Sequence, residues 1–301
     1  MTTYTSRQIS EFASKPLFNP DTPFKSDSSF PRISIVTPSF NQGKFLERTI
    51  LSVLNQNYPN LEYIIIDGGS QDGSVEIIRK YEKFLSYWVS EKDAGHVDAL
   101  NKGFRRATGE IAAWLNSDDL YLPEALLRVA KLFGKKRSSQ VVYGNLYRID
   151  LEDRILEETR LTFFSASGYL YGGLDVPQPS AFWRQELFRE VGGVTQEYFF
   201  SFDTDLFYRF VLAGGRFVFL RDFLACFRLH ATSKTSTLSH IQKADDEKIR
   251  SAYLDHSYSS LYAHAVRGAA KTRRILHYLV QGDGGWLAKR VAGRMSASEN
   301  A

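Results

Sequence analysis

Short apolar runs alternate with helical patterns over the first part of the chain. Four runs have the length and composition of buried strands, at residues 33–36, 61–66, 87–90 and 111–115. Between them, apolar residues recur at the spacing of one helix face. Alternation of strand and helix is typical of a parallel sheet with right-handed crossovers. We therefore predict an α/β protein with a doubly wound, mostly parallel sheet flanked by helices.

Beyond residue 135 the pattern is less regular. Further strands are predicted at residues 141–143, 178–183, 216–220 and 224–228, and short helices at 184–191 and 202–210. From about 145 to 176 the alternation fades, which indicates a hairpin or a loop. After residue 240 the chain has the pattern of helices, at 243–261 and 270–280.

These changes of pattern define the expected domains. Residues 1–31 are polar and contain four prolines, so we expect an extended lead-in that wraps on the domain or is partly disordered. Residues 32–235 would form the main domain, in two halves at 32–120 and 121–235. Residues 236–301 would form a helical C-terminal extension.

Composition excludes several classes of protein. Hydrophobic residues make up 43% of the chain and charged residues 24%, which is ordinary for a globular protein. The net charge of +4 does not favour nucleic acid as a partner but suits an anionic ligand. A single cysteine, Cys226, excludes an intramolecular disulfide. No signal-peptide pattern and no apolar run of membrane-spanning length is present, which predicts a cytoplasmic protein.

Acidic residues follow three of the predicted strands. Asp67 ends one strand, Asp93 follows the next, and Asp118 and Asp119 follow the strand at 111–115. The carboxyl ends of parallel strands meet at one edge of a sheet, where ligands bind. Adjacent carboxylates repel and need a cation or hydrogen-bond donors, and Mg²⁺ and Mn²⁺ prefer oxygen ligands. The alternative is structural, because aspartate also favours turns and helix caps.

Two common nucleotide-binding motifs are missing. The chain has no Gly-x-Gly-x-x-Gly after its first strand and no Gly-x-x-x-x-Gly-Lys-Ser/Thr. A dinucleotide-binding Rossmann domain and a P-loop are therefore both poorly supported.

Seven segments together carry a resemblance to a known family. They are residues 36–41, 49–56, 58–62, 66–74, 98–103, 107–110 and 115–119. In order and spacing they resemble family 2 glycosyltransferases, which are inverting, nucleotide-sugar-dependent enzymes of the GT-A fold. The resemblance covers roughly residues 32–234.

The resemblance implies a nucleotide-sugar site. Thr37, Pro38 and Ser39 would line the nucleotide pocket, with Asp67 and Asp93 near the base. The other residues at matching positions are Asn41, Asn101, Asn116, Ser117 and Asp118. Asn116 stands where the family has the first acid of its Asp-x-Asp motif, so the site carries one negative charge fewer.

The resemblance also implies a metal site and a catalytic base. Asp118 would hold a divalent cation, Mn²⁺ or Mg²⁺, that bridges the two phosphates of the donor, with Asp119 and His230 as further ligands. A lone histidine also has a structural interpretation. Asp203 and Asp205 match the motif that supplies the base, and we favour Asp203. Their alternative role is to place negative charge at a helix N-terminus.

The expected activity is transfer of a sugar from a nucleotide-diphosphate sugar to a hydroxyl of a glycan, lipid-linked or other acceptor. One alternative is a non-catalytic nucleotide-sugar-binding or scaffold protein of a glycan assembly complex. Another is a nucleotidyltransferase, although residues 37–41 lack the glycine-rich basic loop typical of that class. The C-terminal helices combine basic and apolar residues. They are candidates for peripheral contact with the inner face of the membrane, or for a homodimer contact.

Overall fold

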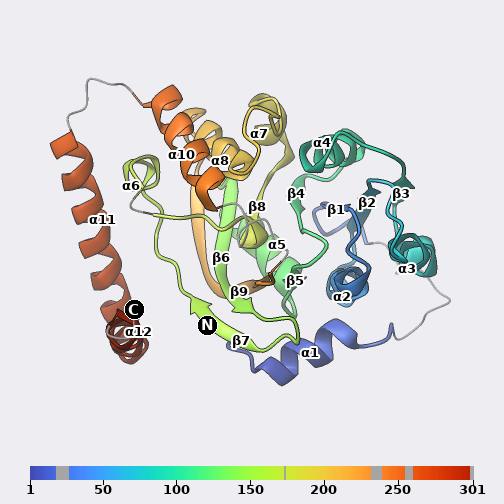
Figure 1. Ribbon diagram of the computed structural model, residues 1–301, viewed down its shortest axis with the longest axis horizontal. Helices are drawn as coiled ribbons and strands as arrows, with labels where there is room; N and C mark the ends of the chain where they lie inside the picture. Colours follow the sequence, from blue (N-terminus) through green and yellow to red (C-terminus); the bar gives the residue numbers. More distant parts are fainter. Residues whose placement is uncertain (18–26, 173, 232–238, 255–259, 299–301) are drawn as a thin grey trace. The chain divides into compact units, whose positions relative to one another are not determined.

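The computed structural model describes residues 1–17, 27–172, 174–231, 239–254 and 260–298. The chain divides into two compact units (Figure 1). The first contains residues 1–160 and 176–249, and the second contains residues 161–175 and 250–301. This division falls within a helix near residue 250, and the predicted domain boundaries stay predictions. The segment 161–175 also groups with the C-terminal helices instead of with the main domain.

The first unit is built on a mixed, mostly parallel sheet. Its strands are β1 (Ile33–Ser39), β2 (Leu61–Asp67), β3 (Tyr87–Ser90), β4 (Ile111–Trp114), β5 (Leu120–Tyr121), β6 (Val141–Ile149), β7 (Ile155–Thr159), β8 (Ala181–Arg184) and β9 (Phe217–Arg228). They lie in the order β3-β2-β1-β4-β8-β6-β9-β5, with β7 paired to β6. Strands β1 to β4 are parallel to one another, and β6 is parallel to β9. The predicted fold class is confirmed.

Two details of the sheet differ from the sequence pattern. The strands predicted at 216–220 and 224–228 are one strand, β9, whose register against β6 shifts beside Asn145. The bulge preserves pairing across the polar residues Arg221 and Asp222, which break the apolar run. The region after residue 145 begins as the β6–β7 hairpin, in agreement with the prediction of a hairpin or loop.

Helices cover both faces of the sheet. Helices α2 (Gly43–Leu54) and α3 (Ser74–Tyr81) lie on one face of β1 and β2, and α4 (His96–Arg106) lies on the other (Figure 1). The described part of this unit also contains the helices α5 (Ala125–Lys135), α7 (Gln185–Glu190), α8 (Phe202–Leu212) and the first part of α10 (Ser239–Tyr253), in addition to an N-terminal helix described below.

Successive side chains of the strands point to opposite faces of the sheet and form a hydrophobic core on each face. Ile33 and Ile35 pack with Leu46 and Ile50 of α2 in an aliphatic cluster. On the opposite face, Trp114 and Trp183 lie at a ring-centroid distance of 5.3 Å within a cluster of aromatic rings. Phe104, Phe188, Phe207 and Phe210 complete that cluster. Burial of apolar surface on both faces explains why these strands are apolar throughout.

The N-terminal lead-in is not simply extended, as the sequence analysis expected. Residues Ser6–Ser14 form helix α1, which begins with a capping box between Thr5 and Gln8. Its apolar side chains Ile9 and Ala13 are buried in a further core cluster with Leu120 and Tyr147. The first proline follows only at Pro16, so it ends the helix rather than preventing it. Residues 18–26, which are part of the segment that was expected to be extended or partly disordered, lie outside the described residues.

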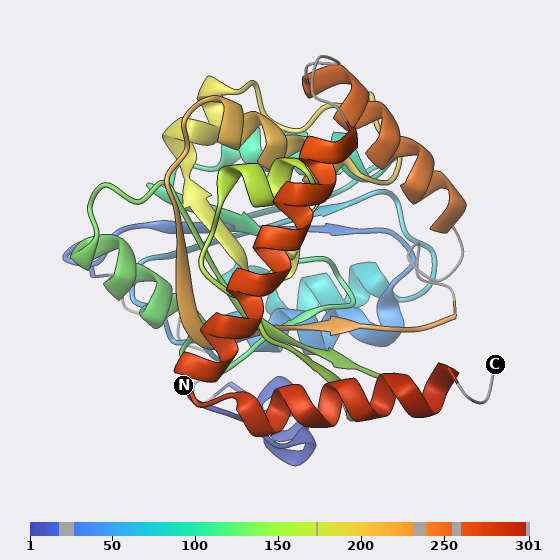
Figure 2. The same ribbon diagram turned by 90° about the vertical axis from the view of Figure 1, so that its left-hand side faces the viewer.

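The second unit consists mainly of helices α6 (Ala166–Leu170), α11 (Ser260–Val280) and α12 (Gly284–Ser298). Helices α11 and α12 run in different directions from the turn that joins them (Figure 2). Tyr278 and Trp286 pack across this turn with ring centroids 5.1 Å apart. Among the described residues, no helix is long and apolar enough to cross a membrane. Leu276, Leu279 and Val280 are exposed on α11, and peripheral membrane or dimer contact stays a prediction.

Two glycines allow a test of how α4 packs on the sheet. A Cβ at Gly103 would overlap Val36 of β1, whereas a Cβ at Gly134 of α5 would meet nothing within 4 Å. We expect Gly103→Ala to lower the free energy of unfolding by about 1–3 kcal/mol, because overpacking displaces the helix. Gly134→Ala should raise it by about 0.5–1 kcal/mol through helix propensity. Denaturant titration measures both, and equal effects would contradict this account of the interface.

Candidate active site

The loops that follow β1, β2 and β3 meet at the carboxyl edge of the sheet. Ser39 pairs with Asp67, and Asp67 pairs with Ser90, so the ends of the three strands lie in register. Strand β4 is parallel to β1 and ends at Trp114, immediately before the Asn116–Asp119 turn. The predicted nucleotide-site residues at the ends of these strands therefore lie along one edge.

Asp67 organises the loop after β2. It is fully buried, and its Oδ2 accepts hydrogen bonds from the Gly69 and Ser70 amides at 3.1 and 2.8 Å. The hydroxyl of Ser90 donates to the same oxygen at 2.7 Å, and that of Ser70 donates to Oδ1 at 2.6 Å. Asp67 was predicted either to lie near the base of the nucleotide or to form a turn. These contacts show that it forms the turn after β2.

Asp93 lies against the same loop. Its Oδ1 accepts the Gly95 amide at 2.8 Å, as a residue at the start of α4 would. Its Oδ2 would be 3.0 Å from a Cβ at Gly68, so any larger residue at 68 would displace this carboxylate. The loop after β2 and the loop after β3 therefore form one continuous surface.

The three residues after Val36 differ in orientation. The Thr37 side chain is buried, with Oγ1 3.1 Å from the Tyr63 hydroxyl. Pro38 is buried at the end of β1, and the buried Ser39 hydroxyl has no hydrogen-bond partner among the described residues. Asn41 adopts a positive φ of 52° and accepts the Gln71 amide at 2.9 Å. Asn41 thus joins the loop after β1 to the loop after β2.

In the turn after β4, the two adjacent aspartates have separate environments. Asp119 is fully buried, and its Oδ1 accepts the backbone amide of Arg228 at 2.9 Å. Burial, together with the negative charge of Asp118, raises the pKa of Asp119 well above its usual range. Thr49 of α2 holds the turn by donating to the backbone carbonyls of Ser117 and Asp119. Asp119 is therefore a structural carboxylate of the turn.

Asp118 faces the end of β9. Its Oδ2 is 3.0 Å from Nε2 of His230, and the imidazole packs against Phe45 with ring centroids 5.0 Å apart. The structure thus brings together two of the three predicted metal ligands, and Asp119 is directed to Arg228 instead. In the part of the chain that the structure describes, no group of three or more His, Cys, Asp or Glu side chains is arranged to hold a metal.

Asn116 presents an unused acceptor beside Asp118. Its Nδ2 donates to Asp119 Oδ2 at 3.3 Å and to Gln178 Oε1 at 3.4 Å. Its buried Oδ1 has no partner among the described residues. Gln178 is itself fixed by donation to the Trp114 carbonyl at 2.7 Å. Gln178 was not predicted as a site residue, because the sequence pattern indicated a strand over residues 178–183, whereas Gln178–Ser180 form a 3-10 turn.

A buried arginine ties this turn to the rest of the unit. Arg228 is 1% exposed and donates to the carbonyls of Asp118 and Asp150 at 2.9 and 2.6 Å. It also forms an ion pair with the buried carboxylate of Asp153 at 2.6 Å, and Arg48 of α2 pairs with the same carboxylate. This role could not be predicted from the sequence, because the partners lie more than 70 positions away.

The two carboxylates of the predicted catalytic motif point in different directions. Asp205 is fully buried and bound by Thr195 and by Arg209, whose Nη2 lies 2.7 Å from Asp205 Oδ2. Asp203 instead has its pKa raised to about 6, mainly by burial, with a further contribution from the charge of Asp246. Asp203 therefore changes protonation state near neutral pH, which suits a general base.

Aromatic contacts locate the start of α8. Phe202 packs against His96, the first residue of α4, and against Trp114, the last residue of β4. Asp203 is thereby placed at the same edge of the sheet as the Asn116–Asp119 turn. Asn101 of α4 secures the preceding loop by donating to the Val194 carbonyl at 2.8 Å, which is a structural contact for a residue predicted to bind the donor.

Helix α10 contributes two acids that the sequence analysis did not select. Asp245 accepts the amides of Phe200 and Ser201 at 2.7 and 3.3 Å, and so holds the segment that leads into α8. Asp246 lies close enough to raise the pKa of Asp203. An acidic pair in a helix normally faces solvent, so the sequence alone carried no signal for either contact.

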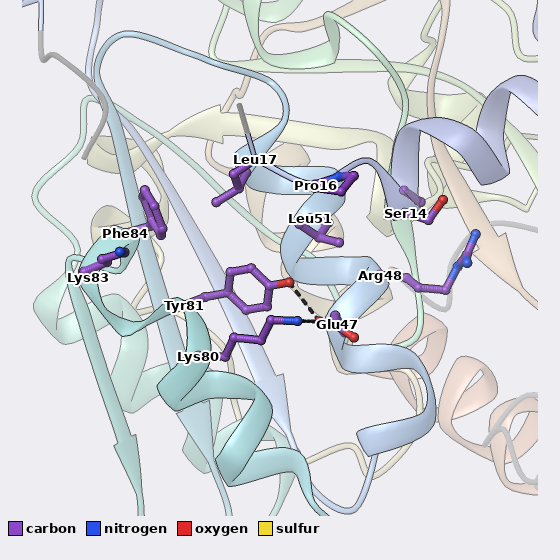
Figure 3. Close-up of a pocket in the computed structure, with 11 residues that line it drawn as sticks. Ser14, Pro16, Leu17, Glu47, Arg48, Leu51, Lys80, Tyr81, Lys83 and Phe84 are labelled. Atoms are coloured by element: carbon purple, nitrogen blue, oxygen red, sulfur yellow. Dashed lines mark hydrogen bonds and ion pairs between the residues drawn. The ribbon is translucent and has the colours of Figure 1, made fainter. Parts of the chain in front are cut away.

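A separate hollow of about 420 Å³ lies between α1, α2 and α3 (Figure 3). Lys80 and Tyr81 of α3 both point to Glu47 of α2, at 2.6 and 2.8 Å. None of its lining residues belongs to the predicted site.

Comparison with known proteins identifies the family. Residues 34–192, which are more than half of the chain, match the sequence profile of "Glycosyl transferase family 2". The chain belongs to glycosyl transferase family 2. An uncharacterized glycosyltransferase of Mycobacterium tuberculosis is 32% identical to this glycosyltransferase over 188 residues, covering 62% of this chain and 71% of the relative.

Solved structures share the fold of this family 2 glycosyltransferase. Residues 1–349 of TarS from S. aureus, in complex with UDP-GlcNAc, match 80% of this chain and 72% of that chain, with a TM-score of 0.62 and 16% identity. The mannosyltransferase PcManGT from Pyrobaculum calidifontis, in complex with GDP-Man and Mn²⁺, matches 96% of this chain and 87% of that chain, with a TM-score of 0.57 and 17% identity. The predicted family and GT-A-type fold are confirmed.

The buried ion pairs at Asp153 allow a test of what holds the site. Replacing Asp153 by Asn removes the carboxylate that pairs with the buried guanidinium of Arg228 and with the half-buried guanidinium of Arg48. We expect Asp153→Asn to lower the free energy of unfolding by about 3–5 kcal/mol. Glu152→Gln is the matched control, because Glu152 pairs with Arg154 at the surface and should cost less than about 1 kcal/mol. Equal losses in a denaturant titration would contradict the central role of Asp153.

Proposed function

We propose that this glycosyltransferase transfers a sugar from a nucleotide-diphosphate sugar to an acceptor hydroxyl with inversion at the anomeric carbon, as a step in glycan biosynthesis. The observation that carries the proposal is the placement of Asp203. Its carboxylate has a pKa of about 6 and lies at the same edge of the sheet as the Asn116–Asp119 turn. In this proposal a base and a candidate phosphate-binding turn act at one edge of the sheet, although Asp119 and Asp203 are 84 positions apart in the sequence.

In this proposal Asp203 removes the proton of the acceptor hydroxyl as its oxygen attacks the anomeric carbon. The bond from that carbon to the diphosphate oxygen breaks, and the nucleoside diphosphate leaves. No enzyme nucleophile is required, because inversion needs a single displacement. Asp205 is a weaker candidate, since its carboxylate is already bound by Thr195 and Arg209. A non-catalytic scaffold protein would not require a carboxylate with a raised pKa at this edge of the sheet.

Unused polar atoms support binding of the donor at this edge. The buried Asn116 Oδ1, Ser39 Oγ and Ser201 Oγ have no partner within the described ranges. Buried polar atoms are normally paired, so unpaired ones at a functional edge favour a ligand. TarS binds UDP-GlcNAc and PcManGT binds GDP-Man in their solved complexes, which supports a nucleotide sugar as the donor class here.

The residues present also fit a divalent cation. Asp118 supplies a carboxylate oxygen, His230 supplies an imidazole nitrogen, and the unpaired Asn116 Oδ1 lies in the same turn. These are donor types that Mn²⁺ accepts. A cation bound there would neutralise charge on the diphosphate of the donor. Asp118 and His230 would hold the cation. Because Asn116 is neutral, the site would be less negative than an Asp-x-Asp motif with two acids.

The base assignment predicts the behaviour of Asp203→Asn. This variant should lose at least about 100-fold in kcat while keeping its affinity for the donor, because proton removal acts in the transition state. Turnover and donor binding are measured separately, by product formation and by calorimetry. Near-normal turnover of Asp203→Asn would show that Asp203 is not the base that removes the proton of the acceptor hydroxyl.

The pH dependence of the same reaction provides the control. The base must be ionised, so kcat/KM should fall as pH decreases through about 6. Asp246→Asn removes a neighbouring negative charge and should shift this fall to lower pH. Burial also makes ionised Asp203 destabilising, so Asp203→Asn should be at least as stable as the native chain at pH 8. A pH profile unaffected by Asp246→Asn would contradict the proximity argument.

The metal proposal predicts a link between cation and donor. Mn²⁺ should tighten nucleotide-sugar binding in calorimetry, and EDTA should abolish that gain together with activity. Asp118→Asn should lose most of the effect of Mn²⁺ on donor affinity, whereas Asp72→Asn, in the loop after β2, should keep it. Donor binding and turnover that are both unchanged in EDTA would leave Asp118 with a hydrogen-bonding role only.

A further inference from the structure

A large groove lies at the edge of the sheet opposite the candidate active site. Its volume is about 1050 Å³, and it is open to solvent. Arg32, Glu110, Gln140 and Arg216, which immediately precede β1, β4, β6 and β9, all line it. These four strands run in the same direction, because β8 is antiparallel to both β4 and β6. The groove is therefore at their amino ends, away from the carboxyl edge that holds Asp118.

Positive charge dominates the lining. Five arginines contribute to the groove against two glutamates. Glu110 pairs with Arg184, and Glu62 outside the lining pairs with Arg32, so three arginines remain against Glu186. The arginines are Arg32, Arg137, Arg184, Arg189 and Arg216. They come from four separate segments of the chain, so the cluster is a product of the fold and not of a basic run in the sequence.

Several of these guanidinium groups keep donors available. Arg216 uses its Nε for the Ser138 carbonyl at 2.6 Å, which fixes the side chain and leaves its terminal nitrogens for another acceptor. Arg189 donates one Nη2 hydrogen bond to the Ala107 carbonyl at 3.2 Å. Arg137 is exposed and makes no side-chain hydrogen bond or ion pair within the described part of the chain. Partly fixed arginines are well suited to bind carboxylate or phosphate.

Gln185 supplies an independent indication of a ligand. It lines the groove and is only 3% exposed, yet neither Nε2 nor Oε1 has a hydrogen-bond partner among the described residues. A buried amide without partners is destabilising, by about 1–3 kcal/mol for each unsatisfied group. Such a side chain offers N–H donors and a carbonyl acceptor together, and a sugar hydroxyl can both accept and donate a hydrogen bond.

We propose that this groove binds an anionic saccharide, whose carboxylate or phosphate groups meet the arginines and whose hydroxyl meets the amide of Gln185. The groove is large enough for several sugar units, since its volume exceeds that of typical small-molecule pockets. Single-stranded nucleic acid fits less well. Of the two phenylalanines that line the groove, Phe133 is buried, and Phe30 packs edge-on against Tyr58, so neither offers a free stacking surface.

Binding by the full chain tests the proposal without any assay of turnover. The probes are hexagalacturonate, phosphorylated maltohexaose, unmodified maltohexaose and oligouridylate, titrated by calorimetry at low and high salt. At least one of the two anionic saccharides should bind, and its affinity should fall as the salt concentration rises. The saccharide that binds more tightly shows whether the groove prefers carboxylate or phosphate. Unmodified maltohexaose should not bind. Tighter binding of oligouridylate, or no binding of either anionic saccharide, would overturn the proposal.

Variants locate the binding. Gln185→Leu should weaken binding of the saccharide about tenfold without lowering the melting temperature, because it removes an amide that has no protein partner. Arg137→Ala should weaken it similarly, whereas Arg79→Ala, an exposed arginine of α3 outside the groove, is the matched control. A lower melting temperature with unchanged binding for Gln185→Leu would assign Gln185 a structural role and reject the site.

Binding of the saccharide at the groove can be tested independently of the proposed transfer reaction. Asp203→Asn should bind the saccharide as the native chain does, since Asp203 is not part of the groove. Loss of binding in Asp203→Asn would place the saccharide at the catalytic edge and overturn the proposal.

Discussion

The buried charge of Arg228 is the constraint on which the candidate active site depends. A guanidinium cannot lose its proton in a protein, so its burial requires acceptors on several sides. The turn after β4, the β6–β7 loop and Asp153 provide them, and Arg48 shares the carboxylate of Asp153. Because the backbone of Arg228 also binds Asp119, one residue fixes both the shape of the turn and the direction of its two acids. Asp118 is left to face His230.

The sequence predicted the structure best where a pattern arises within a single strand or helix. Apolar runs predicted β1 to β4, and acids at their ends predicted the edge where they meet. It was least informative about side-chain direction inside turns. Asp118 and Asp119 are neighbours of the same type, and only the distant Arg228 determines which one is buried. The same limit applies to Asp245 and Asp246, whose contacts with the α8 region depend on where a separate helix packs.

Asp203 and Asp205 illustrate what local geometry could have added. Residues two positions apart on a helix point about 200° apart, because each residue turns the chain by about 100°. Two such carboxylates cannot share one small site. Arg209 lies four positions after Asp205 and on the same helix face, so an ion pair between them was foreseeable. The raised pKa of Asp203 was not, because it arises from burial and from Asp246.

The unpaired atoms of Asn116, Ser39 and Ser201 have a consequence for the protein as a cellular component. Each is a cost to the folded state that a bound ligand can remove, so the liganded protein unfolds less often than the free one. Proteases that act on transiently opened chains sample the unfolded population. If a nucleotide sugar binds at these atoms, as proposed above, the abundance of this glycosyltransferase is coupled to the supply of its donor, and a cell depleted of that donor would clear the idle enzyme sooner.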